Sequence, residues 1–250
     1  MFEMWIEHIG EYGFLLALVI GLGFGFVHAF DPDHMVAVST IVGQYRNPFR
    51  SFWVGISWGL GHTTTLLIVG LVIIALKVGI PATLYPFFEA AVALMLIGLG
   101  VQVIYSIRKN KVHQHIHGHE EDDHSHFHSP AENPADSTEH HESKGIGRPF
   151  FRTKSYVIGT VHGLAGSGAL ILLVTASITS PLTALTFILL FGLGSVLSMG
   201  MVTIIISFPF VLTANRAPNL NRYIQRSFGV LSILLGSFLM YGFFVENGVL

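Results

Sequence analysis

Residues 27–34 constrain this chain more than any other segment. They place two histidines and two aspartates inside an otherwise apolar run that covers residues 12–42. An ionised side chain at the centre of a bilayer costs roughly 2.5–3.5 kcal/mol on insertion scales, and such residues mark ion or proton paths. Imidazole and carboxylate together are also ligands for first-row divalent metals. The segment therefore predicts a membrane protein that handles a transition-metal ion.

The composition supports a membrane location. Of the 250 residues, 51% are hydrophobic and only 11% are charged, whereas a soluble domain carries about 25% charged residues. The absence of cysteine excludes disulfides and thiolate ligands. Residues 1–11 contain three glutamates and no lysine or arginine, so we expect no cleaved signal peptide.

Six apolar runs reach the length of about 20 residues that a membrane-spanning helix needs. They cover residues 12–42, 52–76, 87–107, 155–178, 182–213 and 227–245. The first run is too long for one straight helix, and Asp31-Pro32 inside it is typical of a helix start, with Asp at the N-cap and Pro at the first helical position. We therefore predict an all-α integral membrane protein of six transmembrane helices, the first broken near Asp31-Pro32. Transporters build ion sites at such breaks.

The basic residues predict the orientation. Twelve of the thirteen lysines and arginines fall on one side of a six-span chain, and only Lys77 falls on the other. Cytoplasmic loops carry the excess of these residues. The prediction is a multi-pass protein of the cytoplasmic (inner) membrane, with both termini outside.

A weak internal repeat divides the membrane portion. Residues 59–62, Gly-Leu-Gly-His, recur as Gly-Leu-Gly-Ser at residues 192–195, and His28 has a counterpart in His162. His28 and His62 are 34 residues apart, and His162 and Ser195 are 33 residues apart. We predict two three-helix repeats, residues 1–107 and 155–250, inverted relative to one another, as in many transporters. Chance similarity between glycine-rich helices is the alternative.

The candidate metal ligands are histidines and aspartates in the apolar runs. The main set is His28, Asp33, His34 and His62, and a more tentative set is Asp31, His162 and Ser167. Simpler interpretations stay open. Asp31 would only cap a half-helix, His62 would be a buried hydrogen-bonding side chain, and the glycines and serine after His162 would be a helix-packing surface.

Residues 108–154 form a separate, histidine-rich loop on the predicted cytoplasmic side. The loop is too polar to fold alone and is predicted to be disordered. Alternating histidines next to four acidic residues are typical of a weak, multivalent metal tract, which a cytoplasmic metallochaperone would contact; a solvated tether is the alternative. Its histidines are His113, His115, His117, His119, His124, His126, His128, His140 and His141.

The motifs resemble a known transporter family. His28-x4-Asp33-His34 resembles the His-x4-Asp-His signature of the nickel/cobalt transporter (NiCoT) family, and Gly61-His62-Thr63 resembles its second motif, Gly-His-Ser/Thr. The six-span layout and residues 162–167 are similar to the smaller, urease-accessory-type permeases. The Leu-Gly-x-Asp-Thr motif of larger uptake members is absent, and related efflux permeases also carry histidine-rich loops. The ion ligands that the resemblance implies are His28, Asp33, His34 and His62.

The function that these features predict is secondary transport of Ni(II), with Co(II) as the other candidate and import slightly favoured. The chain lacks the Gly-x4-Gly-Lys-Ser/Thr phosphate loop of ATP-driven proteins. We expect no enzyme activity, organic cofactor or nucleic-acid partner. An efflux permease, a zinc permease and a metal sensor stay open. An intramembrane serine protease using Ser167 and His162 is remote, because Ala165 stands where a rhomboid-like motif needs glycine.

Overall fold

The computed structural model describes residues 19–43, 45, 47–77, 81–109, 113–117, 124–128, 151–163 and 167–246. The helical residues Val19–His28, which end a helix at His28, are called here the first half-helix. The further elements are α2 (Pro32–Val42), α3 (Pro48–Leu76), a 3-10 turn (Ala82–Leu84), α4 (Tyr85–Lys109), β1 (His113–His117), β2 (His124–His128), α5 (Thr153–His162), α6 (Ser167–Ser177), α7 (Pro181–Arg216) and α8 (Pro218–Glu246).

Four helices are long and apolar enough to cross a membrane. They are Pro48–Leu76, Tyr85–Arg108, Pro181–Ala214 and Pro218–Val245. Large apolar side chains such as Phe238 and Leu182 are 70% and 68% exposed, which suits a surface in contact with lipid. The prediction of a helical, multi-pass membrane protein is confirmed at this level.

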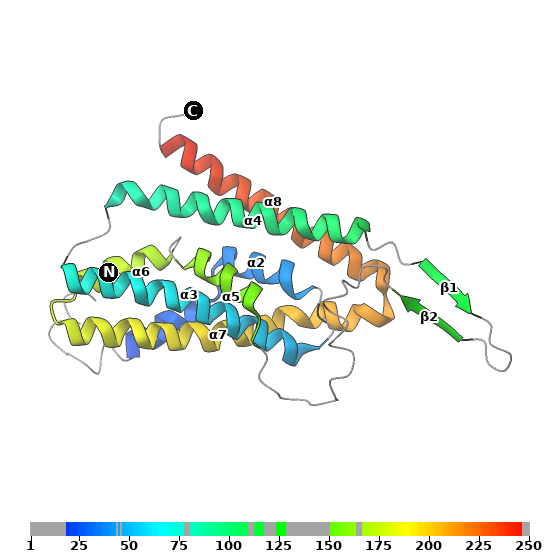
Figure 1. The fold of residues 1–250 in the computed structure, drawn as a ribbon, viewed down its shortest axis with the longest axis horizontal. Helices are drawn as coiled ribbons and strands as arrows, with labels where there is room; N and C mark the ends of the chain where they lie inside the picture. The colour runs from blue at the N-terminus through cyan, green and yellow to red at the C-terminus, as the bar shows by residue number, and fades with distance from the viewer. Residues whose placement is uncertain are drawn as a thin grey trace.

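The long helices form two pairs with shorter helices between them (Figure 1). Helices α4 and α8 pack together on one side, and α3 and α7 pack together on the other. Helix α2 contacts α4, α7 and α8, while α5 contacts α3 and α4. In the loop between α4 and α5, β1 and β2 pair antiparallel with His113 opposite His128.

The predicted break in the first apolar run is present. The first half-helix ends at His28, and the amides of Phe30 and Asp31 donate to the carbonyls of Val27 and His28 (3.0 and 3.1 Å). Helix α2 then begins at Pro32, with Asp31 at the N-cap position. The Asp31 side chain makes no capping hydrogen bond, contrary to the sequence-based expectation, because its carboxylate contacts a histidine instead.

The fourth apolar run is also broken, and here the prediction of one continuous span over residues 155–178 was wrong. Helix α5 ends at His162, Gly163 follows, and α6 begins at Ser167. Three glycines within residues 163–168 lower the helix propensity of this stretch, each by about 1 kcal/mol relative to alanine. The apolar runs over residues 12–42 and 155–178 therefore each contain two separate helices.

Helix α5 runs parallel to α3. The amide of Arg152 donates to Ser57 Oγ (2.9 Å), and eight residues later Thr65 Oγ1 donates to the carbonyl of Thr160 (2.9 Å). From the first contact to the second, the residue numbers rise together in α5 and in α3. The C-terminal end of α5 therefore reaches the middle of α3.

The first half-helix runs parallel to α7 by the same reasoning. Gly21 lies against the carbonyl of Phe187, and Ser198 Oγ donates to the carbonyl of Phe26 (2.7 Å). From the first of these contacts to the second, the residue numbers rise in both the first half-helix and α7. His28, which ends this half-helix, is thus carried to the middle of α7.

Helices α3 and α7 are antiparallel to each other. Gly55 packs against Met199, whereas Thr63, further along α3, donates to the carbonyl of Gly192 (3.3 Å), which is earlier in α7. The first half-helix is parallel to α7, and α5, called here the second half-helix, is parallel to α3. The two half-helices therefore run in opposite directions. They enter the bundle from opposite ends and stop near its middle.

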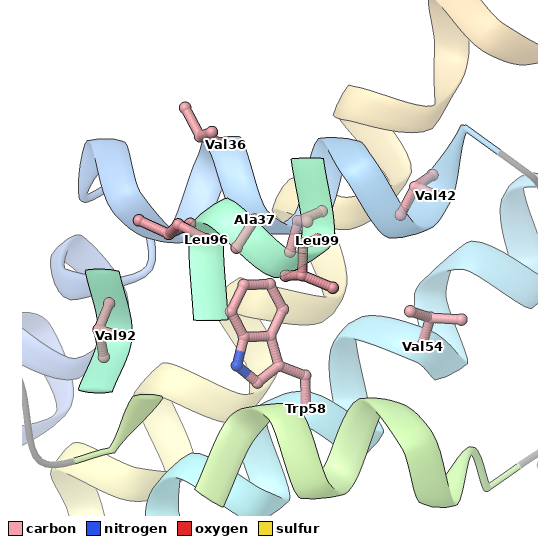
Figure 2. Packing of buried hydrophobic residues seen from close by; sticks show 9 residues of the cluster. Val36, Ala37, Val42, Val54, Trp58, Val92, Leu96 and Leu99 are labelled. Atoms are coloured by element: carbon pink, nitrogen blue, oxygen red, sulfur yellow. The ribbon is translucent and has the colours of Figure 1, made fainter. Parts of the chain in front are cut away.

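An apolar cluster fixes α2 against its neighbours. Figure 2 shows the indole of Trp58, from α3, pointing between Ala37 of α2 and Leu99 of α4. Trp58 and Ala37 are completely buried. The first turn of α2 is thereby held against the face of α3 that carries His62.

Candidate metal site

Four buried histidines meet where the two half-helices end. His28 ends the first half-helix, His34 lies in the first turn of α2, His62 is in the middle of α3, and His162 ends α5. Their ring centroids are 4.5 Å apart for His28–His34, 4.8 Å for His28–His62 and 4.1 Å for His34–His162. The fold therefore brings four imidazoles from four helices into one cluster.

Two carboxylates contact these rings. Asp31 Oδ2 lies 3.1 Å from His28 Nδ1. Asp33 contacts two histidines, with Oδ1 3.2 Å from His34 Nδ1 and Oδ2 2.8 Å from His162 Nε2. A carboxylate on one ring nitrogen fixes the orientation of a metal-binding histidine and leaves its other nitrogen for the ion.

Several ring nitrogens in the cluster are left for another partner. His34 Nε2, His62 Nδ1 and His162 Nδ1 are buried and have no hydrogen-bond partner among the described residues. His28 Nε2 and His62 Nε2 face each other at 2.9 Å. A buried polar atom without a partner costs about 1–3 kcal/mol, and a bound divalent ion would offset this cost by accepting the nitrogen lone pairs.

Among the described residues, the donor atoms form two groups that can each hold a metal ion. The first group is His28, His34 and His62, and the second is Asp33, His34 and His162; within each, one ligand atom per residue lies within 4.8 Å of the others. Since the chain has no cysteine, the donors are imidazole nitrogen and carboxylate oxygen, which suit Ni(II), Co(II) and Zn(II).

The structure thus gathers the main predicted set, His28, Asp33, His34 and His62, into one place, although their role as ligands stays a prediction. Of the tentative set, His162 joins the cluster and Asp31 contacts His28. Ser167 begins α6, but its side chain lies outside the described part of the chain.

The loop histidines are described only in part. His113, His115 and His117 are in β1, and His124, His126 and His128 are in β2. His119, His140 and His141 lie outside the described residues, so the predicted metal tract stays a prediction.

Two aromatic residues of the site were not predicted from the sequence. Trp58 stacks on His34, with centroids 5.7 Å apart and an interplanar angle of 20°, and Phe191 lies 5.2 Å from His28. Trp58 precedes His62 by four residues, which places both on one helix face. That spacing was the available signal for Trp58. For Phe191 there was none, because its contact with His28 depends on how the first half-helix packs on α7.

Comparisons with known proteins now identify the family. No family model matches the chain, and no solved structure matches it. The chain is 37% identical over 235 residues to the urease accessory protein UreH of Bacillus sp. (strain TB-90), which covers 94% of this chain and 95% of the relative. The chain belongs to the urease-accessory-type permeases of the nickel/cobalt transporter (NiCoT) family. Nickel/cobalt transport by a membrane permease is the function that this membership supports.

Proposed function

We propose that this NiCoT permease is a secondary transporter that moves Ni(II), and Co(II) as a second substrate, across the cytoplasmic membrane through the four-histidine cluster. The observation that carries the proposal is the convergence of His28, His34, His62 and His162 at the ends of two half-helices. The sequence contains no phosphate loop, so ATP hydrolysis would need another chain, which favours secondary transport. Import is favoured over export, and no enzyme activity or organic cofactor is involved.

The proposed ligands replace the water around the ion. His28 and His62 present their Nε2 atoms to each other, and His34 Nε2 is the third donor. Asp31 orients His28, and Asp33 orients both His34 and His162. A dehydrated cation also gains from the half-helix C-termini at His28 and His162, because these ends carry partial negative charge.

Matching glycine contacts support the two inverted repeats of the proposal. A Cβ on Gly25 of the first half-helix would overlap the carbonyl oxygen of Phe191 on α7. Gly159 of α5, 134 positions after Gly25, would overlap the carbonyl oxygen of Trp58 on α3 in the same way. Trp58 precedes Phe191 by 133 positions, so each contact has its counterpart in the other half.

A second pair of contacts follows the same rule. Gly194 of α7 lies against the carbonyl of Leu22, and Gly61 of α3 lies against the carbonyl of Tyr156. Gly194 follows Gly61 by 133 positions, and Tyr156 follows Leu22 by 134 positions. Such close backbone approach requires small residues, and its recurrence at fixed offsets is not expected from chance similarity.

The contacts between α4 and α8 show the same kind of repeat. Gly100 lies against Ile233, and Gly236 lies against Ile97. Gly236 follows Gly100 by 136 positions, and Ile233 follows Ile97 by 136 positions. The proposed arrangement is six spans, with the two halves exchanging contacts across an axis in the membrane plane and the ion site near that axis. The excess of basic residues favours a cytoplasmic position for the loop, with both termini outside.

Nickel content of whole cells tests the proposal. Cells producing the native chain, the His28→Ala variant or neither are exposed to radioactive nickel at equal expression. We expect accumulation above the empty control with the native chain and none with His28→Ala. Depletion below the control would reassign the chain as an exporter that uses the same site. Equal content in all three would contradict nickel transport, provided that membrane insertion is verified.

The histidine-rich loop is proposed to collect or deliver ions on the cytoplasmic side, with a metallochaperone as its partner. Replacement of its nine histidines by asparagine is expected to raise the KM for nickel and to retain the maximal rate, since the core ligands are unchanged. Flux into vesicles over a range of nickel concentrations measures both. Complete loss of flux in a correctly inserted variant would mean that the loop holds the transport site.

A further inference from the structure

On the basis of the transport proposed above, we propose that the cluster holds two binding stations for one ion, which passes between them around His34. The first station is His28, His34 and His62, and the second station is Asp33, His34 and His162. In both, the ligand atoms lie within 4.8 Å of one another. Small side-chain movements would bring three such ligands to the distance of about 2.0–2.2 Å that a first-row ion requires.

His34 belongs to both stations through different nitrogens. Its Nδ1 lies 3.2 Å from Asp33 Oδ1, and the other oxygen of this carboxylate lies 2.8 Å from His162 Nε2. Its Nε2 is buried without a partner among the described residues and is assigned to the side of His28 and His62. A neutral imidazole has only one nitrogen lone pair for a ligand bond, so His34 binds the ion at one station at a time. When the ion passes from the first station to the second, the proton of the ring moves from Nδ1 to Nε2, so that the charge of His34 is unchanged.

The ring of His34 lies next to a histidine of each station. The His34 centroid is 4.5 Å from that of His28 and 4.1 Å from that of His162. An ion that leaves His28 and His62 meets Asp33 and His162 while it is still beside His34. It therefore exchanges ligands one after another and is never fully hydrated or fully bare between the two stations.

Each station has a ligand from a different half-helix. His28 comes with the first half-helix, which is parallel to α7, and His162 comes with α5, which is parallel to α3. Because α3 and α7 are antiparallel, the half-helices reach the cluster from opposite ends of the bundle. Movement of one half-helix would open its own station and leave the other station assembled.

Trp58 provides a readout of both stations that is separate from transport. Its ring lies 5.7 Å from His34 and 5.5 Å from His162, and bound Ni(II) quenches indole fluorescence at such short range. The experiment uses the full-length chain with Trp5 and Trp53 replaced by phenylalanine, titrated with Ni(II) alone. The variants are His62→Ala, His162→Ala and the double variant. Ser232→Ala is the control, because Ser232 contacts α4 through Leu96 and is not part of the cluster.

We expect each single variant to retain quenching of Trp58, because one station remains, and the double variant to lose it. Nickel flux in vesicles should fall to background in both single variants, since the ion has no second station to enter. Loss of quenching in either single variant would replace the two stations with one four-histidine site. Native flux in either single variant would show that its station is not used. Absence of nickel flux in the native chain would instead contradict the proposed transport, and the quenching results would then still decide between one site and two.

Discussion

Replacement of His34 by alanine is expected to reduce nickel flux in proteoliposomes by at least about 100-fold, since changes to groups that only orient metal ligands already cost 10–100-fold. His34 is the one residue present in both groups of donor atoms. Its ring also stacks on Trp58, and its Nδ1 contacts the Asp33 carboxylate. No other described side chain takes its place between His28 and His162, and the variant therefore loses both stations together.

The His34→Ala variant needs a test of folding, because it also removes a buried ring. Thermal unfolding of the purified variant in detergent, compared with Ser232→Ala, separates loss of the site from loss of the fold. A folded His34→Ala protein with the native transport rate would refute the assignment of the cluster. His34→Gln, which keeps most of the side-chain volume, should be as inactive as His34→Ala.

The second large effect is expected at Gly25, which has no side chain that could bind the ion. Gly25→Ala would place a Cβ on the carbonyl oxygen of Phe191 and within 2.9 Å of the amide nitrogen of Ser195. Both are backbone atoms of α7 and cannot rotate away, so the first half-helix must move outward. Overpacking of this kind typically costs about 1–3 kcal/mol. His28, three residues further on, would move away from His62, and flux should fall with stability.

Gly23 provides the matched control on the same half-helix. A Cβ there would meet nothing within 4 Å, and alanine is the better helix former by about 0.8–1.0 kcal/mol. We therefore expect Gly23→Ala to melt at or above the native temperature and to transport normally. Equal melting temperatures and equal flux for Gly23→Ala and Gly25→Ala would show that the backbone contact with α7 does not position His28.

The sequence was most informative where the chemistry is local. His28, Asp33 and His34 lie within seven residues of an apolar run, and Pro32 between them marks the helix start. These features predicted both the break and the place of the cluster. The glycine before His62 predicted a close helix contact, and the structure places the backbone of α5 there.

The features of the fold and the site that the sequence did not predict depend on contacts between distant segments. The break after His162 has no proline to mark it, and glycine alone does not distinguish a packed helix from an interrupted one. The two oxygens of Asp33 contact His34 and His162, and the contact with His162 joins positions 129 residues apart, so it could not be predicted from the local motif. Uniformly apolar helices also give no amphipathic pattern, so the sequence does not show which face of each span is buried.

The position of the first half-helix has a consequence for biosynthesis. Helix α2, which follows it, has 11 residues at 1.5 Å each, so it covers about half of a hydrocarbon layer of about 30 Å and cannot cross the bilayer alone. The Ser198 partner of the first half-helix follows Phe26 by 172 residues, and the His162 partner of Asp33 follows by 129. A nascent chain therefore exposes residues 28–34 well before the partners of this segment have been synthesised. Until α5 and α7 have been synthesised, residues 28–34 must stay in the translocon, at the water interface or with a chaperone, so this segment reaches its final position only after helices that follow it in the chain.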